Sequence, residues 1–189
     1  MNKKIGIRFI QCGKCISFIL LSILVEQTYL SAQIVPLNNS NFKTAVELWF
    51  TDEANAKLTY GHIKDWNVTA VTSMQRAFKD RSTFNEDISA WNVGNVKNMY
   101  GMFSGATSFN QPLNNWVVSK VKSMNEMFYN AHSFNQDISD WNISNVQNIN
   151  GIFCNATSFN QDITCWNIDY NILYQDPFIN INVQNVPMQ

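Results

Sequence analysis

An internal repeat of 25 residues constrains this chain more than any other feature of its sequence. A fixed period of this length is typical of stacked repeats, in which each coil buries its apolar side chains against the next. The repeat therefore predicts a solenoid held together by stacked aromatic rings. Three aromatic series keep the interval: Trp66, Trp91, Trp116, Trp141 and Trp166; Phe84, Phe109, Phe134 and Phe159; Phe78, Phe103, Phe128, Phe153 and Phe178.

The spacing inside one repeat predicts a short helix followed by a strand. Val96, Met99, Phe103 and Ala106 are three and four residues apart, as on one face of a helix. Residues 113–118 have the aromatic and β-branched bias of a strand. The helices are expected to end in left-handed caps, at Asp80, Gly105, Asn130 and Asn155.

The expected fold class is therefore an α/β solenoid. It consists of leucine-rich-repeat-like coils of about 25 residues, with a parallel strand on one face and a short helix on the other. Residues 42–50 (FKTAVELWF) have apolar positions at helical spacing. We expect them to form an N-terminal capping helix, because an uncovered first coil would expose core and unpaired backbone.

The first residues have the pattern of a secretory signal peptide. Lys3, Lys4 and Arg8 precede an apolar run of ten residues, 16–25, and small residues follow at 31–32. The alternative is a membrane anchor, which needs about 20 apolar residues. The predicted organisation is a signal peptide at 1–32, a lead-in and cap at 33–65, the repeat solenoid at 66–183 and a tail at 184–189. The mature chain is then secreted or at the cell surface, without a membrane span.

Removal of the leader changes the charge balance. Lys plus Arg falls from 13 to 9 and Asp plus Glu from 14 to 13, so the net charge moves from −1 to −4. A nucleic-acid-binding protein needs a basic stripe to neutralise phosphates. We therefore expect no nucleic acid among the partners.

Two cysteines remain after leader cleavage, and both fall in the same repeat. An oxidising compartment favours a disulfide between Cys154 and Cys165. The alternative is a pair of free thiols whose geometry forbids the bond.

Polar residues also recur at the repeat interval. We expect the row Asn85, Asn110, Asn135 and Asn160, and the row Asn67, Asn92, Asn142 and Asn167, to hold turns and to link neighbouring coils. Asp137 and Asp162 would lie on adjacent coils and could hold calcium, which takes six to eight oxygen ligands. We favour turn or capping roles for these carboxylates, and we expect no metal and no cofactor.

The repeat closely resembles the BspA-like leucine-rich-repeat surface proteins, which are also described by the DUF285 domain. The resemblance is carried by the apolar and aromatic positions of one unit, Val121, Met124, Met127, Phe128, Phe134 and Trp141, with the segments 135–139 and 142–145 between and after them. It covers roughly residues 42–178 and implies a secreted or surface-displayed repeat protein. Some relatives are adhesins, and the family offers no catalytic motif to transfer.

The expected function is a protein- or glycan-binding, adhesin-like module outside the cell. The alternative is a structural, self-assembling solenoid that associates end to end and has no separate ligand. An enzyme is not expected, because no catalytic constellation stands out from the repeat. The candidate ligand-binding face consists of outward polar residues near the predicted strands: Ser89, Asn92, Asn114, Asn115, Ser139, Asp140, Asn142, Thr164 and Asn167.

Overall fold

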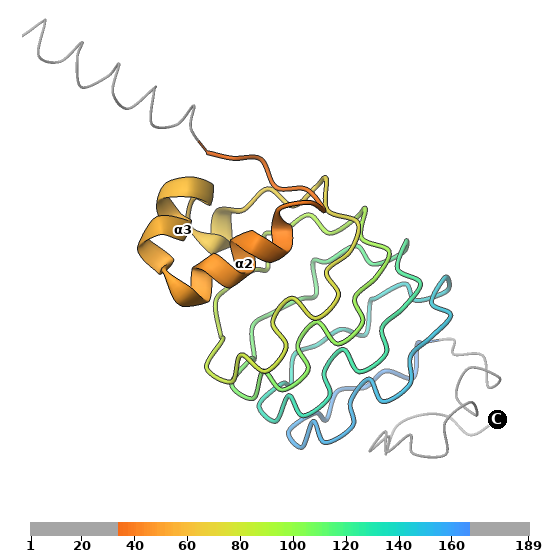
Figure 1. Cartoon of the computed structure of the whole chain (residues 1–189). Coiled ribbons are helices and arrows are strands. Elements are labelled where there is room, and N and C mark those ends of the chain that lie inside the picture. Colours follow the sequence, from red (N-terminus) through yellow and green to blue (C-terminus); the bar gives the residue numbers. More distant parts are fainter. Residues whose placement is uncertain (1–33, 167–189) are drawn as a thin grey trace, which may run out of the picture. The chain divides into compact units, whose positions relative to one another are not determined.

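The computed structural model describes residues 34–166. The predicted leader, the end of the repeat region after residue 166 and the tail at 184–189 lie outside the described residues. The described part begins with a short lead-in and two helices, α2 (Phe42–Thr51) and α3 (Glu53–Tyr60). A single turn of 3-10 helix, η1 (Ile63–Asp65), leads into the repeats (Figure 1). Among the described residues, no helix has both the length and the apolar character needed to span a bilayer.

Helix α2 covers the first repeat with one apolar face. Phe42, Ala45, Val46 and Trp49 are three or four residues apart, and all four are buried. The Phe42 ring meets the Trp66 ring edge to face at 6.5 Å, and Trp49 meets the same ring at 6.1 Å. The predicted capping helix over residues 42–50 is therefore confirmed.

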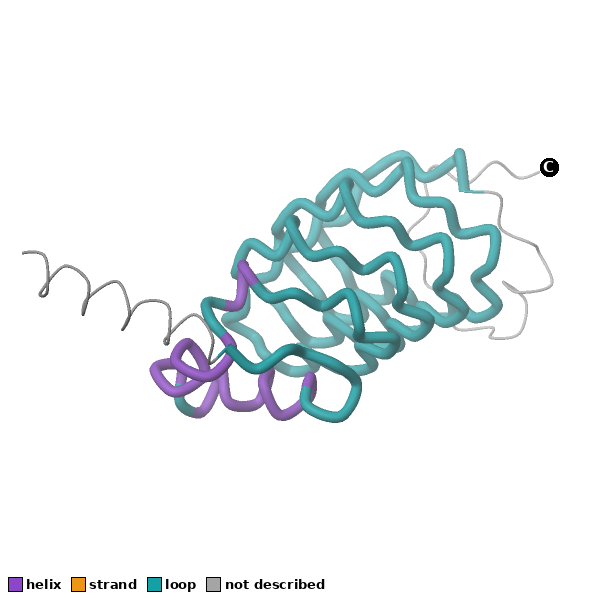
Figure 2. The backbone as a smooth tube through the Cα atoms, turned by 90° about the horizontal axis from the view of Figure 1, so that it is seen from above, coloured by secondary structure: helices purple, strands orange, loops and turns teal. Residues whose placement is uncertain are grey.

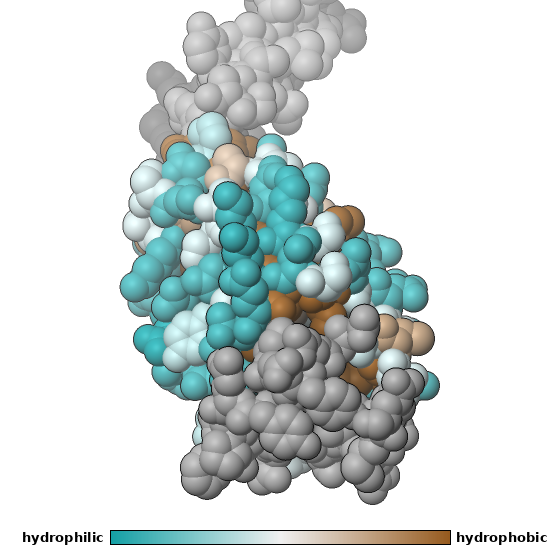
Figure 3. Space-filling model, turned by 90° about the vertical axis from the view of Figure 1, so that its right-hand side faces the viewer, coloured by the Kyte–Doolittle hydropathy of each residue, from teal (hydrophilic) through white to brown (hydrophobic). Residues whose placement is uncertain are grey.

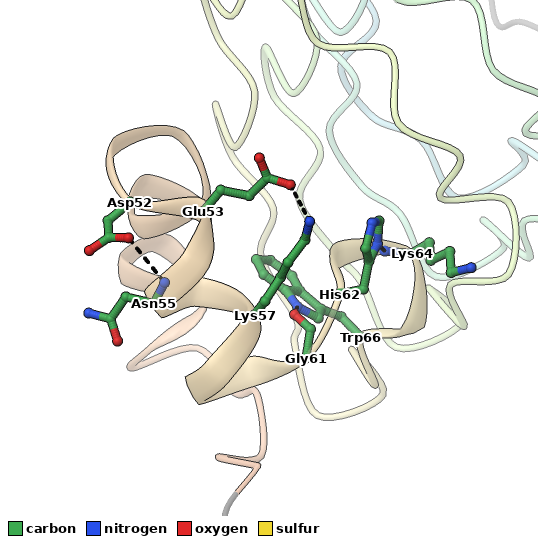
Figure 4. Close-up of polar contacts among 8 residues, drawn as sticks. All are labelled: Asp52, Glu53, Asn55, Lys57, Gly61, His62, Lys64 and Trp66. Atoms are coloured by element: carbon green, nitrogen blue, oxygen red, sulfur yellow. Dashed lines mark hydrogen bonds and ion pairs between the residues drawn. The ribbon is translucent and has the colours of Figure 1, made fainter. Parts of the chain in front are cut away.

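Helix α3 was not predicted, although its ends carry recognisable signals. Asp52 caps its start, because the Asp52 Oδ1 accepts from the Asn55 N–H at 3.1 Å (Figure 4). Lys57 Nζ lies 2.6 Å from Glu53 Oε1 one turn earlier. The helix ends at Gly61, whose φ of 80° is a left-handed conformation that glycine tolerates. The Trp66 Nε1–H donates to the Gly61 carbonyl at 3.0 Å and ties this end to the first repeat.

The predicted α/β solenoid of strands and helices is wrong. Residues 66–166, all within the described part, form neither a helix nor a strand, and the chain there is drawn as loops in Figure 2. Strand-like pairing is reduced to isolated parallel bridges, such as Ser73–Asn98 and Asn98–Ser123. The repeats instead form side-by-side coils made of turns. We number them coil 1 (66–90), coil 2 (91–115), coil 3 (116–140) and coil 4 (141–165).

Left-handed residues prevent the predicted helices. The expected left-handed position is confirmed, with φ between 54° and 73° at Asp80, Gly105, Asn130 and Asn155. A second left-handed position lies four residues earlier, in the middle of each predicted helix: Arg76, Gly101, Glu126 and Gly151 have φ between 54° and 62°. An α-helix requires negative φ at every residue, so these positions break it into single turns.

The predicted strands are also interrupted by turns. Where coil 2 passes into coil 3, the Trp116 N–H donates back to the Leu113 carbonyl at 3.0 Å, and Trp141 repeats this contact with Ile138 at 3.1 Å where coil 3 passes into coil 4. A bond across three residues is a turn rather than an extended chain. The three-residue separation between the aliphatic residue and tryptophan was the sequence signal for this bend.

Backbone hydrogen bonds join each coil to the next along the left-handed segment. Four N–H groups of coil 3, from Met124, Glu126, Phe128 and Asn130, donate to coil 4 carbonyls at 2.8–2.9 Å. The N–H groups between them close local turns, as Met127 does with the Met124 carbonyl at 3.1 Å. In an ordinary sheet neighbouring peptide groups alternate in direction. Within the left-handed segment of coil 3, all the inter-coil N–H groups point toward the following coil, whereas the Lys122 N–H just before it donates back to the Lys97 carbonyl of coil 2 at 2.8 Å.

Stacked aromatic rings fill the interior, as predicted. The Phe128 ring stacks on Phe134 of its own coil at 3.9 Å. It also stacks on Phe103 of coil 2 at 5.5 Å and on Phe153 of coil 4 at 5.6 Å. Because Phe128 is fully buried among these rings, the apolar contact is continuous from one coil to the next.

The tryptophans add a buried polar link between coils. The Trp141 Nε1–H donates to the Leu113 carbonyl, 28 residues earlier in the chain, at 3.0 Å. Trp91, Trp116 and Trp166 make the same contact at 2.8–3.2 Å. Each indole therefore gives its buried N–H a partner, as a second donor to a carbonyl that already accepts a backbone N–H.

Replacing Trp141 by phenylalanine is expected to lower the free energy of unfolding by about 0.5–1.5 kcal/mol. The ring contacts with Phe128 and Trp166 can persist, but the Leu113 carbonyl loses one of its two donors and keeps only the Trp116 N–H. Urea denaturation of both proteins measures the change. An equal loss for an exposed-site control, Val117→Ala, would contradict a specific role for the indole N–H, since Val117 lies 60% exposed.

Candidate functional site

The predicted ligand-binding face lies at the surface. Six of its residues are exposed and two, Ser89 and Ser139, are half-buried. Asn167 lies outside the described residues. The exposed members are Asn92, Asn114, Asn115, Asp140, Asn142 and Thr164.

Several side chains of this face are already engaged in turns. The Asn142 Oδ1 accepts from the Ser144 N–H at 3.1 Å, and Asn92 does the same with Gly94 at 3.1 Å. The Ser139 N–H donates to the Asp137 Oδ1 at 2.9 Å. These contacts show that side chains in this face stabilise turns of the backbone.

The two asparagine rows have different roles. Asn110 Oδ1 accepts from the Asn135 N–H of the next coil at 2.9 Å, and Asn85 and Asn135 repeat this contact with Asn110 and Asn160. The prediction that amides link neighbouring coils is confirmed for this row. The row that contains Asn92 and Asn142 closes turns within its own coil.

The carboxylates considered for calcium also hold turns. Asp137 and Asp162 each accept from the N–H two residues later, in Ser139 and Thr164, at 2.9 Å. These contacts lower the pKa of both carboxyls, first through the backbone N–H and then through the hydroxyl. The pKa of Asp87 is lowered in the same way, chiefly by the Ser89 hydroxyl. Within residues 34–166, no group of three or more His, Cys, Asp or Glu side chains could hold a metal.

Acidification is expected to destabilise the fold through these turns. A carboxyl whose pKa is lower in the folded state stabilises it above the unfolded pKa, near 4, and that contribution is lost as the pH falls through the folded pKa. The thermal unfolding midpoint should therefore fall between about pH 5 and about pH 3. A triple variant, Asp87→Asn, Asp137→Asn and Asp162→Asn, keeps the accepting oxygens without a titration and should show a flatter pH profile. A variant profile as steep as that of the parent would assign the acid sensitivity to other groups.

A concave surface lies elsewhere, on coils 2 to 4. A groove of about 560 Å³ runs across their left-handed segments. The tyrosines Tyr100 and Tyr129 are half-buried in it, beside the carboxylate of Glu126. Amides and one hydroxyl make up most of the remaining lining: Asn98, Ser123, Asn125 and Asn150. Figure 3 shows rows of hydrophilic residues on one side of the molecule with hydrophobic residues visible between them.

The left-handed backbone shapes this groove. In the left-handed segment, every second peptide group donates its N–H to the next coil. Outward side chains of this segment therefore lie at equivalent places in successive coils and form rows. Gly101 and Gly151 alternate with Arg76 and Glu126 at the equivalent position. A Cβ added at Gly101 would lie 3.3 Å from Arg76 Cγ, so glycine leaves room for the long side chain of the preceding coil. Arg76 lies over the Tyr100 ring at 4.8 Å and donates to the Tyr100 hydroxyl at 2.8 Å.

The groove was not predicted from the sequence, because this segment was expected to form a helix. The lining residues occupy the same positions of successive repeats, as Tyr100, Asn125 and Asn150 do. Polar and aromatic residues that recur three positions before the buried phenylalanine were the available signal.

The two cysteines are free in the structure, so the predicted disulfide is not formed. Cys154 is half-buried and lines the groove with Tyr129, whereas Cys165 is exposed next to Trp166. Ten residues lie between them in the coil, among them the half-buried Phe159.

A family model described as "Mycoplasma protein of unknown function, DUF285" matches residues 44–166, which include α3, most of α2 and all four coils. No curated protein and no solved structure matches the chain.

Proposed function

The chain belongs to the DUF285 family, and we propose that it works as an extracellular module that binds protein or glycan ligands. The groove on coils 2 to 4 carries this proposal. It is large enough to hold several sugar rings or a peptide loop, at about 560 Å³.

The chemistry of the groove suits such ligands. Tyr100 and Tyr129 offer apolar ring surface together with hydroxyl groups. Side-chain amides, such as those of Asn98 and Asn125, can both donate and accept hydrogen bonds to hydroxyl-rich or peptide ligands. Rigid aromatic anchors surrounded by adaptable polar groups are typical of binding surfaces that recognise exposed protein or sugar.

The sequence supports the extracellular part of the proposal. The basic start, apolar run and small residues of 1–32 have the pattern of a secretory leader. The repeat also resembles the BspA-like surface proteins, some of which are adhesins. We propose that surface role for this chain without the strand-and-helix architecture of leucine-rich repeats, since its coils are made of turns.

Binding can be tested with the secreted product of the full-length chain. The probes are an array of oligosaccharides and a set of purified extracellular glycoproteins, each also presented after enzymatic removal of its glycans. Tyr129→Ala combined with Asn125→Ala is expected to weaken binding at least about tenfold. The matched control is Asn142→Ala with Thr164→Ala, on the exposed face that does not line the groove, and it should leave binding unchanged.

Each result has a definite meaning. Loss of binding in the groove variant alone supports the proposal, and the deglycosylated probes then separate glycan from protein recognition. Loss of binding in the control variant alone would assign the binding site to the exposed face that contains Asn142 and Thr164. No binding to any probe, or retention of the product inside the cell, would contradict the proposal.

A further inference from the structure

We propose that the first coil carries a second docking site, for an acidic peptide. The site is the row of main-chain carbonyls of Ser73, Gln75, Ala77 and Lys79, which we call the carbonyl edge. It lies at the α2 end of the stack and is separate from the groove, so it does not depend on the function proposed above.

The edge is defined by comparison with the other coils. In coil 2 the equivalent carbonyls belong to Asn98, Tyr100, Met102 and Ser104, and each accepts an N–H from coil 1 at 2.7–2.8 Å. Coils 3 and 4 repeat the pattern at 2.7–2.9 Å. Coil 1 has no coil before it. Among the described residues, none of its four equivalent carbonyls accepts a backbone hydrogen bond.

The N-terminal cap replaces a preceding coil only in part. The Asn39 Oδ1 accepts from the Thr72 N–H at 2.8 Å, and Asn38 forms a parallel bridge with Ala70. Phe50 of α2 covers Phe78 with ring centroids 6.3 Å apart. The cap thus mimics a coil beside residues 70–72 and over the aromatic core, and it stops short of the carbonyl edge.

A cavity of about 510 Å³ opens over this edge. Its walls are one side of α2, including Lys43 and Glu47, and the segment 75–81 of coil 1. Unpaired backbone acceptors in a row are a template for a chain that presents donors at the same spacing. Such addition of a peptide to an open edge gains affinity from main-chain hydrogen bonds.

The charges around the cavity select an acidic peptide. Arg81 is paired with Glu47, and Arg76 is held against Tyr100. Lys43, Lys79 and the carboxylate of Asp80 line the cavity and make no ion pair among the described residues. The four cationic and two acidic side chains of the lining leave it with a net charge of +2. A peptide with carboxylates at its ends would complement these two ammonium groups.

The repeat itself supplies a probe with the required backbone. Residues 98–105 (NMYGMFSG) donate four N–H groups to the next coil in the intact protein. A synthetic peptide of this sequence, with two added glutamates at each end and a fluorescent label, is expected to bind the full-length chain in an anisotropy titration. The comparison peptide carries N-methyl groups at the amides equivalent to Met99, Gly101 and Phe103. It should bind at least about tenfold more weakly, because three donors are lost while the side chains stay the same.

Charge variants locate the site. Lys43→Glu with Lys79→Glu should weaken binding of the acidic peptide several-fold. The matched control is Lys97→Glu with Lys122→Glu, exposed positions on coils 2 and 3 that make the same change in net charge. A photoreactive group at the peptide's phenylalanine position should cross-link to α2 or to residues 75–81.

The proposal fails if the peptide does not bind, if N-methylation has no effect, or if the control variant weakens binding as much as the Lys43 and Lys79 variant. Cross-linking to the groove instead would assign the peptide to that surface.

Discussion

Replacing Phe128 by alanine is expected to lower the free energy of unfolding by about 3–5 kcal/mol. Phe128 is fully buried and its ring stacks on three other phenyl rings, those of Phe103, Phe134 and Phe153. Its removal leaves a cavity in the middle of the stack and breaks the apolar contact between coils 2, 3 and 4. Because each coil is stabilised by its neighbours, the loss should affect coils on both sides. Urea denaturation followed by tryptophan fluorescence measures it.

Phe159→Ala is the matched control for this prediction. Phe159 belongs to the same repeating series as Phe134 but is only half-buried, with stacking partners at 3.9 Å and 5.9 Å. Its loss should cost clearly less. Equal effects of the two substitutions would mean that the stack is not continuous through Phe128.

Replacing Gly105 by valine is expected to cost about 2–5 kcal/mol. Gly105 has a φ of 73°, which a β-branched side chain strongly disfavours. A Cβ at this position would also lie 2.5 Å from the Asp80 Oδ1 and 3.3 Å from the Asp80 Cα of the preceding coil. The Asp80 side chain can rotate away, but the backbone contact remains. Thermal unfolding should show a lowered midpoint.

A glycine introduced at a left-handed position tests the same backbone conformation without adding a side chain that could clash. Glu126 occupies the other left-handed position, at a φ of 54°, and its neighbours in the series are Gly101 and Gly151. Glu126→Gly should leave the stability unchanged or raise it by about 1 kcal/mol, because glycine removes the left-handed strain. A destabilisation similar to that of Gly105→Val would argue that Glu126 is not left-handed in solution.

The sequence was sufficient to predict what packs inside the coils. The aromatic series required a stack in which equivalent rings meet, and the contacts of Phe128 confirm it. The capping helix followed from four apolar residues on one face of α2. Burial depends on the identity and period of apolar residues, which are visible in the sequence.

The local backbone could not be predicted in the same way. Val96, Met99, Phe103 and Ala106 are all buried, as expected, but they lie in turns and loops rather than in a helix. Buried residues three and four apart are compatible with a helix or with successive single turns, and spacing alone does not separate the two. The deciding residues are Arg76 and Glu126, because arginine and glutamate normally favour a helix and conceal the left-handed position that Gly101 and Gly151 only suggest.

The groove could not be predicted, because its residues were assigned to a helix. In a helix, successive side chains are distributed all around the helix axis. In the observed turns, the outward side chains of each coil lie on the same surface of the stack. Tyr100, Asn125 and Asn150 therefore line one surface that the predicted architecture did not contain. The polar face that was predicted instead is exposed, and its turns follow from short-range Asp and Asn contacts that the sequence indicates directly.

Successive coils are joined by aligned main-chain hydrogen bonds from left-handed segments. Scalar couplings across hydrogen bonds, measured by NMR on isotope-labelled protein, can detect each of these bonds. We expect couplings from the amide nitrogens of the coil 3 segment to the carbonyl carbons of coil 4, in the pairs Met124–Asn148, Glu126–Asn150, Phe128–Ile152 and Asn130–Cys154. Couplings from the same amides to carbonyls four residues earlier in the chain would show a helix and would rule out this arrangement.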